Sequence, residues 1–196
     1  HNAADAIKEY VSNALDEWQR TIEDKTVSEP CIVNFQLDKK TITINYNAPG
    51  MDEDEFETAL KNVGSSSKST REAPQIGYLG IGLWSFNQIG NVATFYSKRD
   101  PRTPTIKVTL RRGSANAEFS YASADEQLTD QGMTIVISEL FLDPTKRDSS
   151  LSVERLRRRL ADRFDSYLKS NQLKISIKSG DRTLNVTARR DNLPSI

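Results

Sequence analysis

Three glycines within six residues form the densest cluster of chemically useful positions in the sequence. Gly77, Gly80 and Gly82 lie in the stretch 75–86, in a chain that has only nine glycines. Glycine tolerates positive φ and lets backbone approach a ligand closely, so this spacing suits a phosphate cradle. Residues 81–89 then read as a helix, whose N-terminus would attract a polyphosphate. A plain glycine-rich connection has the same composition, and the glycines alone do not separate the two interpretations.

A second polar group lies on a predicted helix over residues 3–22. Its apolar positions recur at helical spacing and form one face, made of Ile7, Tyr10, Val11, Ala14, Leu15 and Trp18. At about 100° per residue, Glu9, Asn13 and Asp16 fall in a narrow arc on the opposite side. A solvated helix surface has the same pattern, so the arc by itself leaves both interpretations open.

Composition bounds the function classes. The 196 residues suffice for one domain with a sizeable core, and 27 Lys and Arg balance 27 Asp and Glu. Global charge therefore favours neither nucleic acid nor a membrane surface. The single cysteine, Cys31, excludes an internal disulfide framework and a cysteine-based zinc site. No run approaches about 18 apolar residues and no signal peptide is visible, so we expect a soluble, cytoplasmic chain without a membrane span.

The first half of the chain is predicted to alternate between helix and sheet. Period-two patterns at 31–37 and 41–46 predict a β-hairpin, and the turn cluster 47–50 ends it. An acidic start predicts a helix over 52–62. The small, polar residues of 64–74 predict a mobile loop that leads into the glycine cluster.

The second half is predicted to be strand-rich. Its patterns indicate four strands, at 91–97, 105–112, 117–123 and 133–138. A long helix follows over 150–169, and then a final hairpin of 173–178 and 184–188. The long helix carries a basic run of Arg155, Arg157, Arg158, Arg159 and Arg163. A solvated helix face explains this run, and a nucleic-acid site is the alternative.

Separate stretches of the sequence together resemble one family. Glu9-x-x-x-Asn13-Ala-x-Asp16 resembles the first-helix motif of the GHKL ATPases, which include DNA gyrase, the ninety-kilodalton heat-shock chaperones, histidine kinases and mismatch-repair ATPases. Residues 47–51 resemble the tail of the second motif of this family. Lys68 and residues 77–85 resemble its lid lysine and third motif, and residues 132–136 resemble its late Gly-Thr strand motif. The order and spacing agree over nearly the whole chain.

The resemblance implies a nucleotide site and its chemistry. It assigns nucleotide binding to Asn13, Asp16, Tyr46, Asn47, Gly50, Met51, Lys68, Gly77, Tyr78, Leu79, Gly80, Ile81, Gly82 and Thr134. The Asn13 oxygen can complete an oxygen-lined magnesium shell shared with phosphates and water. Glu9, one helical turn away, can then orient or deprotonate the water that attacks the γ-phosphate of ATP. Because the chain has Glu9 and no internal histidine, the hydrolase branches fit better than the histidine kinases.

One position departs from the family pattern. Tyr46 stands where the second motif has an aspartate that accepts a hydrogen bond from the adenine amino group. Loss of a charged acceptor costs about 1.5–3 kcal/mol, roughly ten- to a hundredfold in affinity. A strand bulge would instead bring Asn45 or Asn47 to the base, since an amide both accepts and donates.

These observations predict an α/β two-layer sandwich of the GHKL (Bergerat) type, a mixed and mainly antiparallel sheet with helices on one face. Residues 1–196 are expected to form one ATP-binding domain, the N-terminal part of a larger protein, with a lid at about 64–80 and a C-terminal helix and hairpin at 150–190. The expected function is magnesium-dependent ATP binding and slow hydrolysis, with lid closure that drives conformational change or homodimerisation. The main alternative is a degenerate, non-hydrolysing interaction module, and a nucleic-acid clamp is the third.

Overall fold

The computed structural model describes residues 3–24, 29–62, 82–114 and 116–189. The helices are α1 (Ala3–Asp24), α2 (Glu53–Asn62), the 3₁₀ helix η1 (Leu83–Gln88), α3 (Val153–Arg163) and α4 (Asp165–Lys169). The strands are β1 (Cys31–Leu37), β2 (Thr41–Tyr46), β3 (Gly90–Lys98), β4 (Ile106–Arg111), β5 (Ala117–Tyr121), β6 (Gly132–Leu140), β7 (Leu173–Ser179) and β8 (Arg182–Val186).

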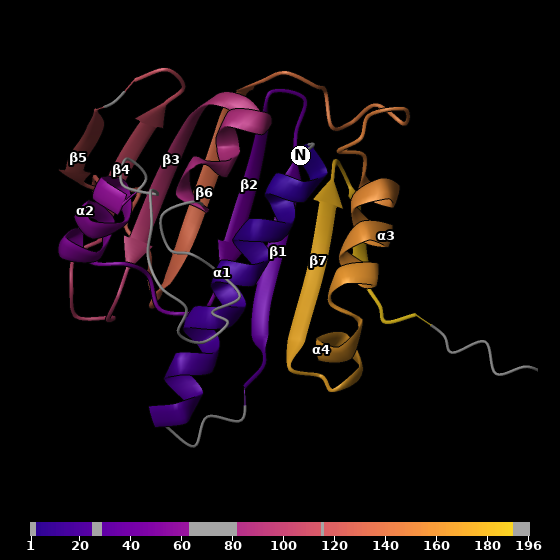
Figure 1. Cartoon of the computed structure of the whole chain (residues 1–196), viewed down its shortest axis with the longest axis horizontal. Coiled ribbons are helices and arrows are strands. Elements are labelled where there is room, and N and C mark those ends of the chain that lie inside the picture. The colour runs from indigo at the N-terminus through magenta and orange to yellow at the C-terminus, as the bar shows by residue number, and fades with distance from the viewer. Residues whose placement is uncertain (1–2, 25–28, 63–81, 115, 190–196) are drawn as a thin grey trace, which may run out of the picture.

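One eight-stranded sheet runs through the described part of the chain, in the order β5-β4-β3-β6-β2-β1-β7-β8. The β1–β7 pair is parallel and every other pair is antiparallel. Figure 1 shows the helices on one face of this sheet, with α1 across its middle, α2 over the β5 end and α3 over the β8 end. The prediction of a mixed, mainly antiparallel two-layer sandwich is confirmed.

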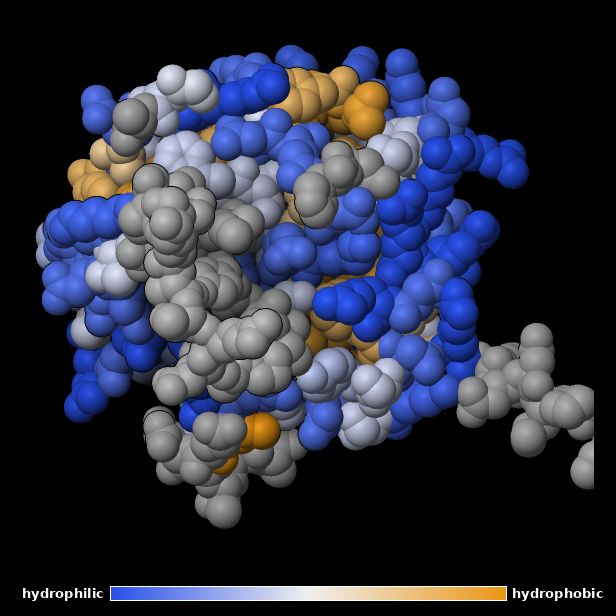
Figure 2. All heavy atoms as spheres, viewed as in Figure 1, coloured by the Kyte–Doolittle hydropathy of each residue, from blue (hydrophilic) through white to orange (hydrophobic). Residues whose placement is uncertain are grey.

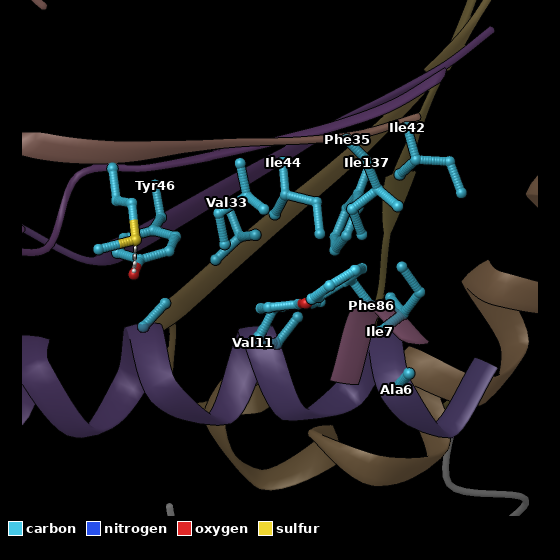
Figure 3. Packing of buried hydrophobic residues seen from close by; sticks show 14 of the residues in the cluster. Ala6, Ile7, Val11, Val33, Phe35, Ile42, Ile44, Tyr46, Phe86 and Ile137 are labelled. Carbon is cyan, nitrogen blue, oxygen red and sulfur yellow. Dashed lines mark hydrogen bonds between the residues drawn. The ribbon is translucent and has the colours of Figure 1, made fainter. Parts of the chain in front are cut away.

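The core lies between α1 and the central strands. β1 alternates strictly, with Cys31, Val33, Phe35 and Leu37 buried and the residues between them exposed. This period of two turns every second side chain of β1 toward the helices. From the other layer, α1 contributes the apolar face expected from the sequence, including Ile7 and Val11 (Figure 3). The apolar pattern therefore fixes which face of α1 is left for polar chemistry.

The segment after the glycine cluster is a 3₁₀ helix rather than a longer regular helix. Ser85 N–H donates to Gly82 O (3.2 Å) and Ile89 N–H to Phe86 O (2.7 Å), which are i to i+3 hydrogen bonds. Leu83 and Phe86 are three residues apart and both buried, and a 3₁₀ helix places such residues on one side. Packing of this pair against the core thus favours the tighter helix.

The single helix predicted over 150–169 is wrong, because the chain breaks it at Phe164. Phe164 has φ −113° and ψ 23°, outside the helical region, and its ring is buried. α3 ends there and α4, which has no buried residue, continues in another direction. The break keeps Phe164 in the core while the chain turns toward β7, and helical periodicity alone does not reveal such a turn. The last hairpin begins at Leu173 as predicted, but its second strand, β8, lies two residues earlier than the predicted 184–188.

Candidate functional site

Glu9 and Asn13 stand one turn apart on the side of α1 that does not enter the core. Glu9 is exposed and Asn13 is half-buried. Neither side chain makes a hydrogen bond or ion pair with another residue in the described ranges. Asp16, on the same polar arc, is half-buried and has an interaction partner. The helix thus presents a carboxylate and an amide that remain available to a ligand.

Gly82 packs directly against Asn13. A Cβ atom added to Gly82 would collide with the Asn13 side-chain amide, with its Cγ at 3.1 Å and its Oδ1 at 3.2 Å. The first-helix motif and the last glycine of the glycine cluster, far apart in sequence, therefore meet in space. Only a residue without a side chain allows this approach.

Tyr46 lies at the end of β2, in the core between the sheet and α1. Its side chain points from β2 toward α1 and is 8% exposed (Figure 3). The Tyr46 hydroxyl donates to Met133 Sδ at 3.0 Å, and the two residues face each other across the β2–β6 ladder. Burial strongly raises the pKa of Tyr46, so its phenol is neutral. Tyrosine and methionine thus fill the space between this end of β2 and α1.

Neither asparagine beside Tyr46 is free to replace it. The Asn47 Oδ1 accepts the Ile32 N–H (2.8 Å), and its Nδ2 donates to the Pro30 carbonyl (3.1 Å). Asn45 lies on the uncovered face of the sheet, where its Oδ1 accepts the Thr134 hydroxyl at 2.7 Å. β2 pairs with β6 in continuous register from Thr41 to Tyr46, without a bulge that would turn Asn45 toward α1. The amide of Asn47 instead ties the end of β2 to the start of β1.

The turn after β2 is held by close backbone packing. A Cβ on Gly50 would lie 2.6 Å from the Lys98 amide nitrogen and 2.7 Å from the Gly132 carbonyl oxygen. Met51 is buried, and its carbonyl accepts the Ser97 hydroxyl at 2.7 Å. The second motif (residues 47–51) and the late Gly-Thr strand motif (residues 132–136) therefore come together, through Gly50 and Gly132.

Thr134 lies on a different side of the sheet from this turn. Side chains alternate along β6, so Met133 faces α1 and Thr134 faces the uncovered side with Asn45. The sequence pattern placed Thr134 near the phosphates, whereas the residue of this pair on the α1 side is Met133. A period-two count from the buried Ile135 gives the facing of both residues from the sequence alone.

The remaining predicted site residues lie outside the described ranges. They are Lys68, Gly77, Tyr78, Leu79, Gly80 and Ile81. The predicted lid at 64–80 lies outside the described ranges as well. Their assignment to the nucleotide stays a prediction.

A charged cluster beside Tyr46 did not emerge from the sequence patterns. Glu17, 8% exposed, accepts from Arg20 at 2.6 Å and lies 3.9 Å from Arg99. Arg99 also donates to Glu55 of α2 and to the Gly50 carbonyl (3.2 Å). Burial raises the pKa of Glu17, although the two arginines oppose this shift. The cluster borders a hollow of about 290 Å³ and ties α1, α2 and the turn after β2 together.

A sequence model of one family matches most of the chain. The family described as "Histidine kinase-, DNA gyrase B-, and HSP90-like ATPase" matches residues 1–139. The chain belongs to this ATPase family. The match covers α1, the turn after β2, the glycine cluster and β6, which include all the residues that the motifs assigned.

A mitochondrial protein is also similar to part of this chain. The "TNF receptor-associated protein 1 homolog, mitochondrial" of Dictyostelium discoideum is 26% identical over 150 residues, which cover 67% of this chain and 20% of the relative. The chain therefore spans about a fifth of that relative's length.

None of the helices in the described ranges is long and apolar enough to cross a membrane.

Members of this ATPase family bind ATP, usually with magnesium, and the polar arc of α1 offers a matching donor set. The described residues contain no group of three His, Cys, Asp or Glu side chains that would cage a metal ion. Magnesium commonly takes one or two protein oxygens and completes its shell with water and phosphate oxygens. The available amide of Asn13 fits such a shell, because its oxygen has no competing partner among the described residues.

Proposed function

We propose that this ATPase-family domain binds ATP with magnesium and hydrolyses it slowly. One observation carries the proposal: Asn13 and Gly82 touch, which brings the first-helix motif and the glycine motif to one place. An anion held there would meet the Asn13 amide and the backbone at the start of η1. The exposed carboxylate of Glu9 lies one helical turn away on the same rigid helix.

In this proposal Asn13 and Glu9 divide the chemistry. The Asn13 carbonyl oxygen would hold magnesium, which when bound neutralises charge on the phosphates. Glu9 would orient the attacking water and accept its proton. The rigid α1 backbone fixes the spacing of the two side chains, so neither group needs to be ordered at the time of reaction.

The region around Tyr46, which we call the base end, supports a mode of base recognition that differs from the one in which the family's aspartate binds the adenine amino group. Tyr46 is neutral, buried and hydrogen-bonded to Met133, so it provides no charged acceptor for an adenine amino group. We infer that affinity rests mainly on the phosphates and that discrimination between bases is weak. The same observation favours the second candidate, a non-hydrolysing interaction module that keeps the fold.

Lid closure and dimerisation complete the proposal. By resemblance to the family, residues 64–80 would close over bound nucleotide and gate a conformational change or homodimer formation in a larger protein. Hydrogen exchange of these residues should slow sharply with a non-hydrolysable ATP analogue and magnesium. Unchanged exchange at saturating analogue would remove closure from the proposal while leaving binding intact.

Calorimetric titration tests the core of the proposal. The chain is titrated with a non-hydrolysable ATP analogue, with magnesium and with a chelator, and phosphate release from ATP is measured in parallel. We expect binding that strengthens with magnesium, together with slow turnover. Binding without turnover would favour the interaction module, and absence of both would refute the nucleotide site.

A further inference from the structure

A hollow beside α3 lies outside the region matched by the ATPase family. Its volume is about 760 Å³, and it forms between the connection after β6, the first turns of α3 and the β7–β8 turn. Every lining residue lies between 144 and 182, beyond the family match, which ends at residue 139. Four arginines line it: Arg147, Arg155, Arg158 and Arg182. The hollow therefore requires an explanation separate from that of the nucleotide site.

Among the described residues, three of the four arginines that line this hollow have no acidic partner. Arg147, Arg155 and Arg158 are exposed and form no ion pair with any residue in the described ranges. The one carboxylate in the lining, Glu154, is shared between Arg182 (3.0 Å) and Arg157 (3.3 Å). Like charges gathered in a concave surface repel one another and raise the local concentration of anions.

Elsewhere on this side of the molecule, three basic residues have acidic partners. Arg159 lies 3.7 Å from Asp5, Lys169 lies 2.9 Å from Asp165, and Arg189 pairs with Asp162. Figure 2 shows hydrophilic side chains along the α3 side of the molecule, so hydropathy alone does not single out the hollow. The gathering of arginines does, because Arg147, Arg155 and Arg158 converge on one hollow without an ion pair in the described ranges, whereas Arg163, which has none either, lies outside it. This concentration favours a compact anion over a long polyanion that tracks the whole helix.

Ser152 and the N-terminus of α3 also line the hollow. Ser152 precedes α3, is 6% exposed and lines the hollow. Its side chain caps no N–H group of α3 and makes no hydrogen bond within the described ranges. The first N–H groups of an α-helix have no intrahelical partner, and α3 is 11 residues long. A hydroxyl without a hydrogen-bond partner in the described ranges and the N–H groups of the first turn of α3 thus lie beside the arginines.

We propose that this hollow binds a compact anion that carries several phosphate groups. Guanidinium groups match phosphate oxygens with two parallel hydrogen bonds, and a helix N-terminus adds backbone donors. The volume lies in the range of small-molecule sites, which span about 300–1,000 Å³. The site is independent of the nucleotide site on α1, since the two share no residue.

Titration of the chain with inorganic tripolyphosphate in a chelator, followed by amide chemical shifts, tests this proposal. We expect the largest shifts at residues 152–155 and in the β7–β8 turn. The double variant Arg155→Gln/Arg158→Gln should weaken binding by about tenfold or more, since each removes charge-assisted hydrogen bonds. Arg163→Gln is the matched control, because Arg163 lies on the same helix but not in the hollow. It should leave the affinity unchanged.

Two further variants separate a built site from general surface charge. Ser152→Ala should weaken binding several-fold, although it removes no charge. Glu154→Gln should tighten binding several-fold, because it releases Arg182 and Arg157 from their shared carboxylate. Equal effects of Arg155→Gln/Arg158→Gln and Arg163→Gln, with no effect of Ser152→Ala, would overturn the proposal.

Additional arms distinguish the source of the phosphates and the location of the anion. A 20-nucleotide single-stranded DNA should bind no more tightly than tripolyphosphate. Much tighter binding that also depends on Arg163 would replace the compact anion with a polynucleotide. In Asn13→Ala, shifts at 152–155 should persist even if ATP binding is lost. Shifts confined to Asn13 and Gly82 would show that tripolyphosphate uses only the nucleotide site, which would also refute the hollow.

Discussion

Two regions beside α1 differ in how their polar groups are paired: the region near Gly82 and the region near the turn after β2. Near Gly82, the polar side chains of Glu9 and Asn13 lack partners in the described structure and remain accessible. Near the turn after β2, Tyr46 and Met133 are buried and bonded to each other. The first region has the properties of a site that receives an anion, and the second region has those of a packed core.

In the proposed nucleotide site, this difference separates the phosphate end from the base end. A phosphate site requires donors that are not already satisfied, and the Asn13 end provides them. A base site requires a cavity with a polar anchor, whereas the aromatic ring of Tyr46 occupies that end with a neutral phenol. Recognition of the phosphates and recognition of the base can therefore be tested separately.

The largest effect is expected at Glu9. Glu9→Gln should lower turnover of ATP by about 10²- to 10⁴-fold while the affinity for nucleotide changes little, because an amide cannot accept the proton. Single-turnover phosphate release and calorimetry measure the two quantities. Hydrolysis at the wild-type rate would exclude Glu9 as the base.

Removal of the Asn13 amide should abolish the magnesium dependence of binding. Asn13→Ala loses the oxygen ligand, and we expect about a ten- to hundredfold loss of affinity in magnesium and almost none in chelator. Asn34→Ala, on the uncovered face of the sheet, is the matched control. If wild type bound equally well in magnesium and in chelator, the assignment of Asn13 would be wrong.

Tyr46→Asp should move the base end toward the family pattern. We expect ATP to bind about tenfold more tightly relative to other nucleotides, at a cost of about 3–5 kcal/mol in the free energy of unfolding from the lost aromatic burial. Tyr46→Phe removes only the hydrogen bond to Met133 and should leave selectivity unchanged. A wild-type chain that is already selective for ATP and loses selectivity in Tyr46→Asp would contradict this account.

A side chain at Gly82 should disturb the phosphate end without changing any charge. Gly82→Ala would push the Asn13 amide aside, and we expect nucleotide affinity to fall several-fold with a stability loss of about 1–3 kcal/mol. When Gly82→Ala is made in the Asn13→Ala background, its effect on affinity should be much smaller, and a double-mutant cycle measures this difference. Additive effects would show that the contact between Gly82 and Asn13 is irrelevant to binding.

The smallest effect concerns Glu17 and the pH dependence of the free energy of unfolding. Burial raises the pKa of Glu17 above its ordinary value of 4.5, so the folded state binds more protons than the unfolded state just above that pH. This contribution to the free energy of unfolding is present below about pH 4.5 and is lost as the pH rises through the higher folded pKa. Denaturant titrations should show that Glu17→Gln flattens this fall, whereas Glu57→Gln, an exposed site on α2, should not.

Local patterns predicted most of the fold, with errors where packing decided. The period-two patterns of residues 31–37 and 41–46 gave β1 and β2 correctly, although apolar Ile32 interrupts the first, because period two is a property of neighbouring residues. The break at Phe164 was missed, since Phe164 also fits a helical apolar stripe. Only its burial against the core shows that the chain turns there. The assignment of Thr134 to the nucleotide came from a motif comparison and stays a prediction, while alternation along β6 turns its side chain to the face with Asn45.

The sequence by itself determined the family, the main elements and the polar arc of α1, because motif spacing and periodicity are local properties. Tertiary structure decided what those residues meet. The contact of Gly82 with Asn13 and the hydrogen bond from Tyr46 to Met133 join segments that lie 69 and 87 residues apart in the chain. The sharing of Glu154 between Arg157 and Arg182 also depends on two distant elements, and Arg155 and Arg158 have no ion pair in the described ranges. Such pairings follow from the packing of layers and the register of strands, which no short stretch of sequence encodes.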